Sequence, residues 1–99
     1  MATGADNHAL GFVELPGLTN AITVLDNMLK AAAVNFVTWE KKLGGRLVTI
    51  IVSGSVASVA AAVAAARRDA NVKSSFVIPA PHPETWKMVR QSAAKYSKD

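Results

Sequence analysis

The segment that most constrains the fold is 34–52, where two strand-like runs flank a short turn that contains two glycines. The first run has the period of two expected for a half-buried strand. Its two predicted faces are Phe36, Thr38 and Glu40 on one side, and Val37, Trp39 and Lys41 on the other. The second run, 47–52, is apolar on both faces, which is typical of a central strand. Because Gly44 and Gly45 permit a tight reversal, the segment predicts a β-hairpin whose tip carries Lys41, Lys42 and Arg46.

The residues before the hairpin predict one strand and one helix. Residues 9–14 alternate and are followed by Pro16 and Gly17, which end a strand. From residue 18 the apolar residues recur at steps of four and three, which places them on one helix face. This predicted stripe consists of Leu18, Ile22, Leu25, Leu29 and Ala32.

The residues after the hairpin predict a second helix, a fourth strand and a terminal helix. Gly54 ends the strand, and Ser55 stands where an N-cap belongs, ahead of an alanine-rich segment that should pack closely on a sheet. Residues 74–78 are strand-like, and three prolines then impose an extended exit. A short helix with one apolar edge follows from about Pro83.

The predicted order is therefore β-α-β-β-α-β, with one further helix at the end. This order favours an α+β, ferredoxin-like fold in which the helices cover one face of a mostly antiparallel four-stranded sheet. We expect a flexible N-terminus at 1–8, a folded domain at 9–83, and a C-terminal helix with a basic tail at 84–99. A protomer of this size with a second apolar surface commonly buries that surface by forming an oligomer.

Composition narrows the class of protein. The 99 residues include no cysteine, which excludes disulfides and thiolate metal sites. No signal peptide is visible, and the most apolar window is interrupted by Ser53, Gly54 and Ser55, so we expect a soluble cytoplasmic protein. The net charge of +4 permits contact with anions but is only a weak indication of nucleic-acid binding. We expect neither nucleic acid nor a membrane as a partner.

The sequence gives little support to catalysis. His8 and His82 are far apart in the chain, and no phosphate-binding loop, dinucleotide fingerprint or nucleophile elbow is present. The glutamates Glu14, Glu40 and Glu84 stand singly at the ends of predicted elements, where solvated or capping roles are the usual ones. We therefore predict no catalytic residues, no cofactor and no metal site.

Several segments, in order and with suitable spacing, resemble the bacterial microcompartment (BMC) shell domain of the single-domain, hexamer-forming type. They run from about residue 9 to residue 82 and read ALGFVE, GLT, DNMLKAA, VTWEK, LVTIIVSGSV and VIPAPH. The resemblance implies a cyclic hexamer that packs edge to edge with other tiles in a protein shell around enzymes. The implied partners are further copies of the chain, other shell proteins and, potentially, the encapsulated enzymes.

The resemblance also assigns two groups of residues. In this family the turn between the second and third strands lines a pore on the sixfold axis, which here is Lys42, Leu43, Gly44, Gly45 and Arg46. The implied residues of the hexamer edge are Asp26, Asn27, Lys30, Ala80 and His82.

The chain departs from the family pattern at four places. Ala80 replaces an arginine that inserts into the neighbouring tile, and Ala33 replaces an asparagine. The segment 53–55 lacks the charged pair of a common RGD motif, and the pore turn is one residue longer than usual. The loss of an arginine anchor removes a strong edge contact, so we expect the chain to be either a minor shell component or a tile that mixes with a sister tile supplying the contact.

Two hypotheses follow for function. In the first, the chain is a structural shell tile, and a ring of cations from Lys42 and Arg46 biases its pore toward small polar or anionic metabolites. In the second, it is an oligomeric, ferredoxin-like regulatory domain that binds a small ligand. The alanine-rich helix and the proline-rich exit are accounted for only by the first.

Overall fold

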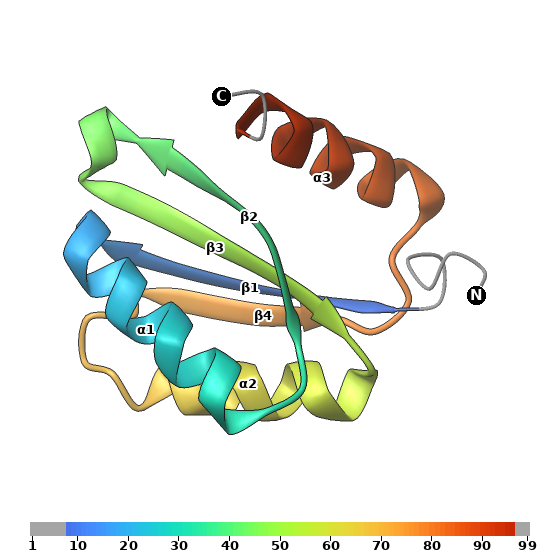
Figure 1. The fold of residues 1–99 in the computed structure, drawn as a ribbon, viewed down its shortest axis with the longest axis horizontal. Coiled ribbons are helices and arrows are strands. Elements are labelled where there is room, and N and C mark those ends of the chain that lie inside the picture. The colour runs from blue at the N-terminus through green and yellow to red at the C-terminus, as the bar shows by residue number, and fades with distance from the viewer. Residues whose placement is uncertain (1–7, 97–99) are drawn as a thin grey trace.

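The computed structural model describes residues 8–96 and has the predicted order of elements (Figure 1). The elements are β1 (Ala9–Pro16), α1 (Leu18–Ala31), β2 (Asn35–Lys42), a 3₁₀ turn (Leu43–Gly45), β3 (Leu47–Gly54), α2 (Val56–Arg67), β4 (Ser74–Ile78) and α3 (Pro83–Tyr96). The strands form one sheet in the order β2-β3-β1-β4, and every neighbouring pair is antiparallel. The predicted ferredoxin-like α+β fold is therefore confirmed. The expected flexible N-terminus, apart from His8, and the last three residues of the expected tail lie outside the described residues.

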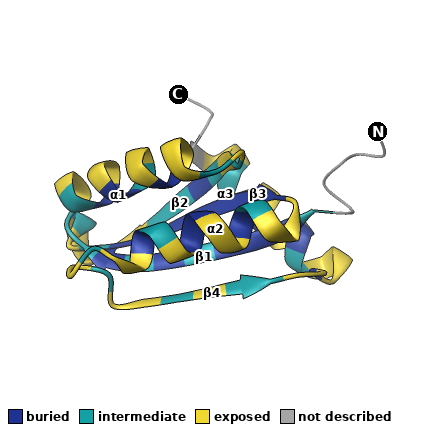
Figure 2. Ribbon diagram, turned by 90° about the horizontal axis from the view of Figure 1, so that it is seen from below, coloured by how far each residue is buried: buried dark blue, intermediate teal, exposed yellow. Residues whose placement is uncertain are grey.

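Helices α1 and α2 cover one face of the sheet and enclose the main core (Figure 2). Val13 and Ile50 from the central strands are fully buried against Val24 of α1 and Val59 of α2. The approach of α2 to β1 is close, since a methyl group at Gly11 would lie 2.7 Å from Cγ1 of Val59. As predicted, the Ser55 hydroxyl caps α2 by accepting a hydrogen bond from the Ser58 N–H at 3.1 Å.

Helix α3 lies on the opposite face of the sheet, so the expectation that helices cover only one face was incomplete (Figure 1). Trp86 and Val89 are buried against Leu10 and Ile51. The Ser92 hydroxyl donates a hydrogen bond to the Glu40 carboxylate, which joins α3 to the edge strand β2. The four apolar residues form a second, smaller core cluster, and the hydrogen bond lies beside it.

A β-bulge in β2 changes which residues share a face. Phe36 pairs with Val52, but Thr38 pairs with Ile51, so Val37 is the additional residue. As a result Val37 packs against the cluster under α3, whereas Trp39 packs against the core under α1 and α2. The prediction that these two residues share a face was wrong, although Trp39 does belong to the core.

Helix α1 buries a different stripe from the predicted one. Its buried residues are Ala21, Val24 and Met28, whereas Leu18, Ile22 and Leu29 are 39%, 53% and 42% exposed. Two apolar lines run along this helix, and the neighbouring line of mostly smaller side chains fits against α2 and the sheet. Leu25 and Ala32 of the predicted stripe are half-buried and pack against the core, so only Leu18, Ile22 and Leu29 form an exposed apolar surface.

Candidate functional site

The turn at the tip of the β2–β3 hairpin has three consecutive residues in the left-handed backbone region. The φ angles are 55° at Leu43, 67° at Gly44 and 90° at Gly45. Glycine adopts this conformation freely, whereas another residue pays about 1–2 kcal/mol. A Cβ atom added at Gly44 or Gly45 would meet nothing within 4 Å. The glycines are therefore required by the backbone angles and not by a lack of space.

Arg46 folds back onto this turn. Its backbone N–H and its side-chain Nε both donate to the carbonyl oxygen of Leu43, at 3.3 and 3.2 Å. The Arg46 carbonyl in turn accepts from the N–H of Gly17 at 3.0 Å, which fixes the base of the turn to the start of α1. Leu43 is 66% exposed, so the apolar side chain at the tip is presented to the surroundings.

Three of the predicted edge residues lie together on the last two turns of α1. Asp26 and Lys30 form an i, i+4 ion pair at 2.8 Å, and both side chains are exposed. The hydrogen bond and the charge of Asp26 raise the pKa of Lys30. Asn27, the residue after Asp26, is also exposed.

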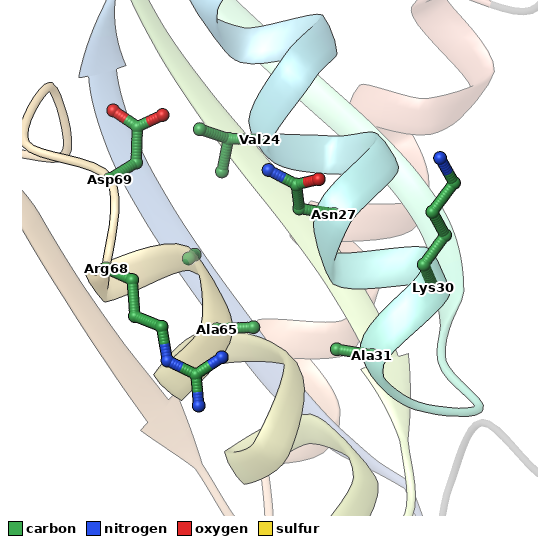
Figure 3. Close-up of a pocket in the computed structure, with 8 residues that line it drawn as sticks. Val24, Asn27, Lys30, Ala31, Ala65, Arg68 and Asp69 are labelled. Atoms are coloured by element: carbon green, nitrogen blue, oxygen red, sulfur yellow. The ribbon is translucent and has the colours of Figure 1, made fainter.

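Asn27 and Lys30 border a groove between the C-terminal ends of α1 and α2. The groove has a volume of about 470 Å³. Its lining residues are Val24, Asn27, Lys30, Ala31, Ala65, Ala66, Arg68 and Asp69. Figure 3 shows Val24 and Asn27 pointing from α1 toward the side on which Asp69 lies, with Ala31 facing Ala65 across the gap. The groove stays open because the alanine side chains that line it are too small to fill the space between the helices.

The other two predicted edge residues lie in the exit from β4. Ala80 is exposed, whereas Pro81 beside it is buried. Nδ1 of His82 accepts a hydrogen bond from the N–H of Glu84 at 3.0 Å, so His82 caps α3. Sequence reasoning missed this role, for which the only signal was the position of His82 directly before Pro83.

Two of the three single glutamates accept hydrogen bonds from serine side chains. The Ser74 hydroxyl donates to Glu14 at 3.1 Å, and Glu40 accepts from Ser92. Within residues 8–96, no group of three histidine, cysteine, aspartate or glutamate side chains could hold a metal ion. No helix in this part of the chain is long and apolar enough to cross a membrane.

One aromatic pair on the face of the sheet that carries α3 was also missed. The rings of Phe12 and Phe76 stack with their centroids 4.7 Å apart, and Phe76 is 51% exposed. A small hollow of about 140 Å³ lies beside them and is bordered by Glu14, Thr49 and Ser74. The pairing depends on the register between β1 and β4, which the sequence pattern does not specify.

These features define a small α+β domain that presents an open hairpin tip, a polar edge and an exposed apolar helix surface. Residues 9–81 match the profile of the BMC domain, and the chain belongs to that family. It is 48% identical over 85 residues to the bacterial microcompartment shell protein PduA of Citrobacter freundii, across 82% of this chain and 90% of that protein. It is 45% identical over 78 residues to the shell protein EutM of Salmonella typhimurium, across 75% of this chain and 80% of that protein.

A crystal structure of a microcompartment protein from Desulfitobacterium hafniense has the same fold. The TM-score is 0.75 and the sequence identity is 26%, across 86% of this chain. The chain spans 48%, about half, of the length of that protein. The predicted membership of the microcompartment shell family is thus confirmed.

Proposed function

We propose that this chain is a structural, non-enzymatic shell protein of a bacterial microcompartment in the cytoplasm, and that it assembles into cyclic hexamers that tile with other shell proteins. The observation that carries the proposal is the 48% identity to PduA across nine-tenths of that shell protein. A single pairwise match of this extent includes the hairpin, both core helices and the β4 exit. We infer that the two predicted groups of site residues, the hairpin tip and the edge, take part in this assembly.

The exposed apolar surface of α1 supports assembly. Leu18, Ile22 and Leu29 are each at least 39% exposed although they recur on one side of a single helix. An exposed apolar line of this kind is stabilised when another protein surface covers it. A neighbouring copy is the occupant that cyclic symmetry provides, because every subunit of a ring has the same surface available.

The hairpin tip is the proposed wall of the central pore. Lys42, Leu43, Gly44, Gly45 and Arg46 would meet their symmetry mates around the axis of the ring. Gly44 and Gly45 leave bare backbone at the tip, and nothing within the chain crowds them. Cations from Lys42 and Arg46 near one opening would favour small polar or anionic metabolites over cations.

The end of α1 and the exit from β4 form the proposed edge between tiles. Asp26, Asn27 and Lys30 are exposed there, as are Ala80 and His82. Because Ala80 has no side chain that could reach a neighbouring tile, this chain would tile most stably beside a sister protein that supplies a longer cationic residue.

Native mass spectrometry of the purified chain tests the hexamer, and electron microscopy of the chain with and without a sister shell protein tests tiling. We expect six copies in solution and extended sheets only in the mixture. A monomer at micromolar concentration would contradict the proposal. A smaller oligomer together with a thermal shift caused by one metabolite would favour the regulatory alternative, for which the groove beside Asn27 would be the binding site.

A further inference from the structure

Leu43 stands at a position where two local preferences both oppose leucine. The left-handed backbone at φ 55° favours glycine or asparagine, and a leucine there costs about 1–2 kcal/mol. The side chain is also 66% exposed, so little packing within the chain compensates for that cost. Neither the backbone conformation nor packing within the chain accounts for a leucine at this position. Such a residue is a candidate for a contact with another chain or for a barrier to solutes.

The side chain of Arg46, unlike that of Leu43, is hydrogen-bonded to the turn. Its Nε donates to the Leu43 carbonyl at 3.2 Å, so the start of the guanidinium group is tied to the backbone of the turn. Leu43 has the side chain that extends from the 3₁₀ turn itself, between the strand ends at Lys42 and Leu47. The turn therefore presents an exposed isobutyl group, and the Arg46 side chain is hydrogen-bonded to the backbone of the same hairpin.

We infer that Leu43, and not a cationic residue, forms the narrowest ring of the pore, and that the pore passes small uncharged organic solutes in preference to ions. This inference rests on the proposed hexamer with the hairpin tips at its axis. The proposed function allows small polar or anionic metabolites. The inference narrows these to small polar metabolites that carry no charge.

The physical reason is the cost of dehydration. An ion that enters a narrow apolar ring loses hydrating water, and an isobutyl side chain offers no hydrogen bond in exchange. Apolar constrictions in pores exclude ions for this reason. A small uncharged alcohol loses far less, because its carbon surface is compatible with the ring. Lys42 and Arg46 then concentrate anions at the mouth of the pore without lowering the barrier at Leu43.

The test compares Leu43→Asn, Leu43→Met and Arg46→Gln with the unaltered protein. Asparagine is close to leucine in size and tolerates the left-handed backbone, so it changes the polarity of the ring with little change in its shape. Methionine keeps the ring apolar. Glutamine at 46 removes the charge. Leu43→Gly, which suits the same backbone angle, replaces the asparagine variant if that variant does not assemble.

Native mass spectrometry first establishes that each variant forms the same six-copy ring. Hexamers are then reconstituted in lipid vesicles, and swelling rates are measured in isosmotic erythritol and in potassium chloride. We expect the unaltered ring to admit erythritol faster than the salt. Leu43→Asn should raise the rate for the salt several-fold with little effect on erythritol, and Leu43→Met should resemble the unaltered protein.

Two results would overturn the inference. One is an unchanged salt rate in Leu43→Asn rings and in Leu43→Gly rings. The other is a larger change in the salt rate from Arg46→Gln than from Leu43→Asn. Both results leave the hexamer intact and reject only the role of Leu43. A monomeric unaltered protein would instead contradict the proposed function.

Discussion

Nδ1 of His82 accepts a hydrogen bond from the N–H of Glu84 at 3.0 Å, and the His82 carbonyl accepts from Thr85 and Trp86. This one residue therefore starts α3, the helix that covers the second face of the sheet. The family resemblance assigned His82 to the tile edge. The structure gives it a role within the chain that is compatible with an exposed imidazole at that edge.

Replacing His82 tests the cap. We expect His82→Ala to lower the free energy of unfolding by about 1 kcal/mol, because an orphan N–H at the start of α3 loses its acceptor. His82→Asn should retain most of the stability, since asparagine is a good N-cap. Urea unfolding followed by tryptophan fluorescence measures both. Equal losses in the two variants would show that the cap is not the source of the stability.

The contact between β1 and α2 gives a second prediction. We expect Gly11→Ala to destabilise the fold by about 1–3 kcal/mol, because its methyl group would lie 2.7 Å from Val59 Cγ1 and 3.0 Å from Val63 Cγ2. In a Val59→Ala background the same change should cost less, because the nearest methyl group is gone. The four proteins form a double-mutant cycle in urea. Additive costs would contradict the proposed clash.

Much of this fold could be predicted from the sequence, because the periods of two and 3.6 are local properties of the chain. The Ser55 cap, the hairpin and the order of elements all follow from local signals. Other features required the structure, and three of them show the reason. The bulge at Val37 depends on pairing with Ile51 and Val52, and the choice between two apolar lines on α1 depends on how α2 packs. The left-handed backbone at Leu43 could not be predicted from the residue type, because leucine seldom adopts this conformation.

The glycines of the turn should be sensitive for a conformational reason. We expect Gly45→Ala to cost about 1 kcal/mol because φ is 90°, although open space surrounds the position. Gly45→Asn should cost less, since asparagine visits the left-handed region more readily. Thermal unfolding compares the three proteins. A destabilisation that increased with side-chain size, larger for asparagine than for alanine, would indicate crowding instead of backbone conformation.

The Asp26–Lys30 ion pair makes stability depend on pH in the alkaline range. Asp26 raises the pKa of Lys30 above its ordinary value of 10.5 in the folded protein. A raised pKa means that the folded state holds the proton more tightly, so the contribution is complete below the ordinary pKa and is lost as pH rises through the folded one. We expect Asp26→Asn to lower the pKa of Lys30, measured by NMR titration of its side chain.

The dependence of stability on pH provides a second test of the ion pair. The stability difference between the unaltered protein and Asp26→Asn should diminish as the pH rises past the pKa of Lys30. It should also diminish in high salt, because both side chains are exposed. A difference that grew with alkaline pH would have the wrong sign for this ion pair.

Cross-linking at the hairpin tip tests the central claim, that six tips converge on one axis. The chain contains no cysteine, so Leu43→Cys introduces a single thiol, and Met88→Cys on the exposed surface of α3 provides a matched control. A short bis-maleimide joins two thiols, so disulfide-free samples of Leu43→Cys should give covalent dimers in high yield, and a tris-maleimide of similar reach should also give trimers. Met88→Cys should give neither product. Equal yields of cross-linked product from both variants, or no product from Leu43→Cys in a protein that native mass spectrometry shows to be hexameric, would contradict the account.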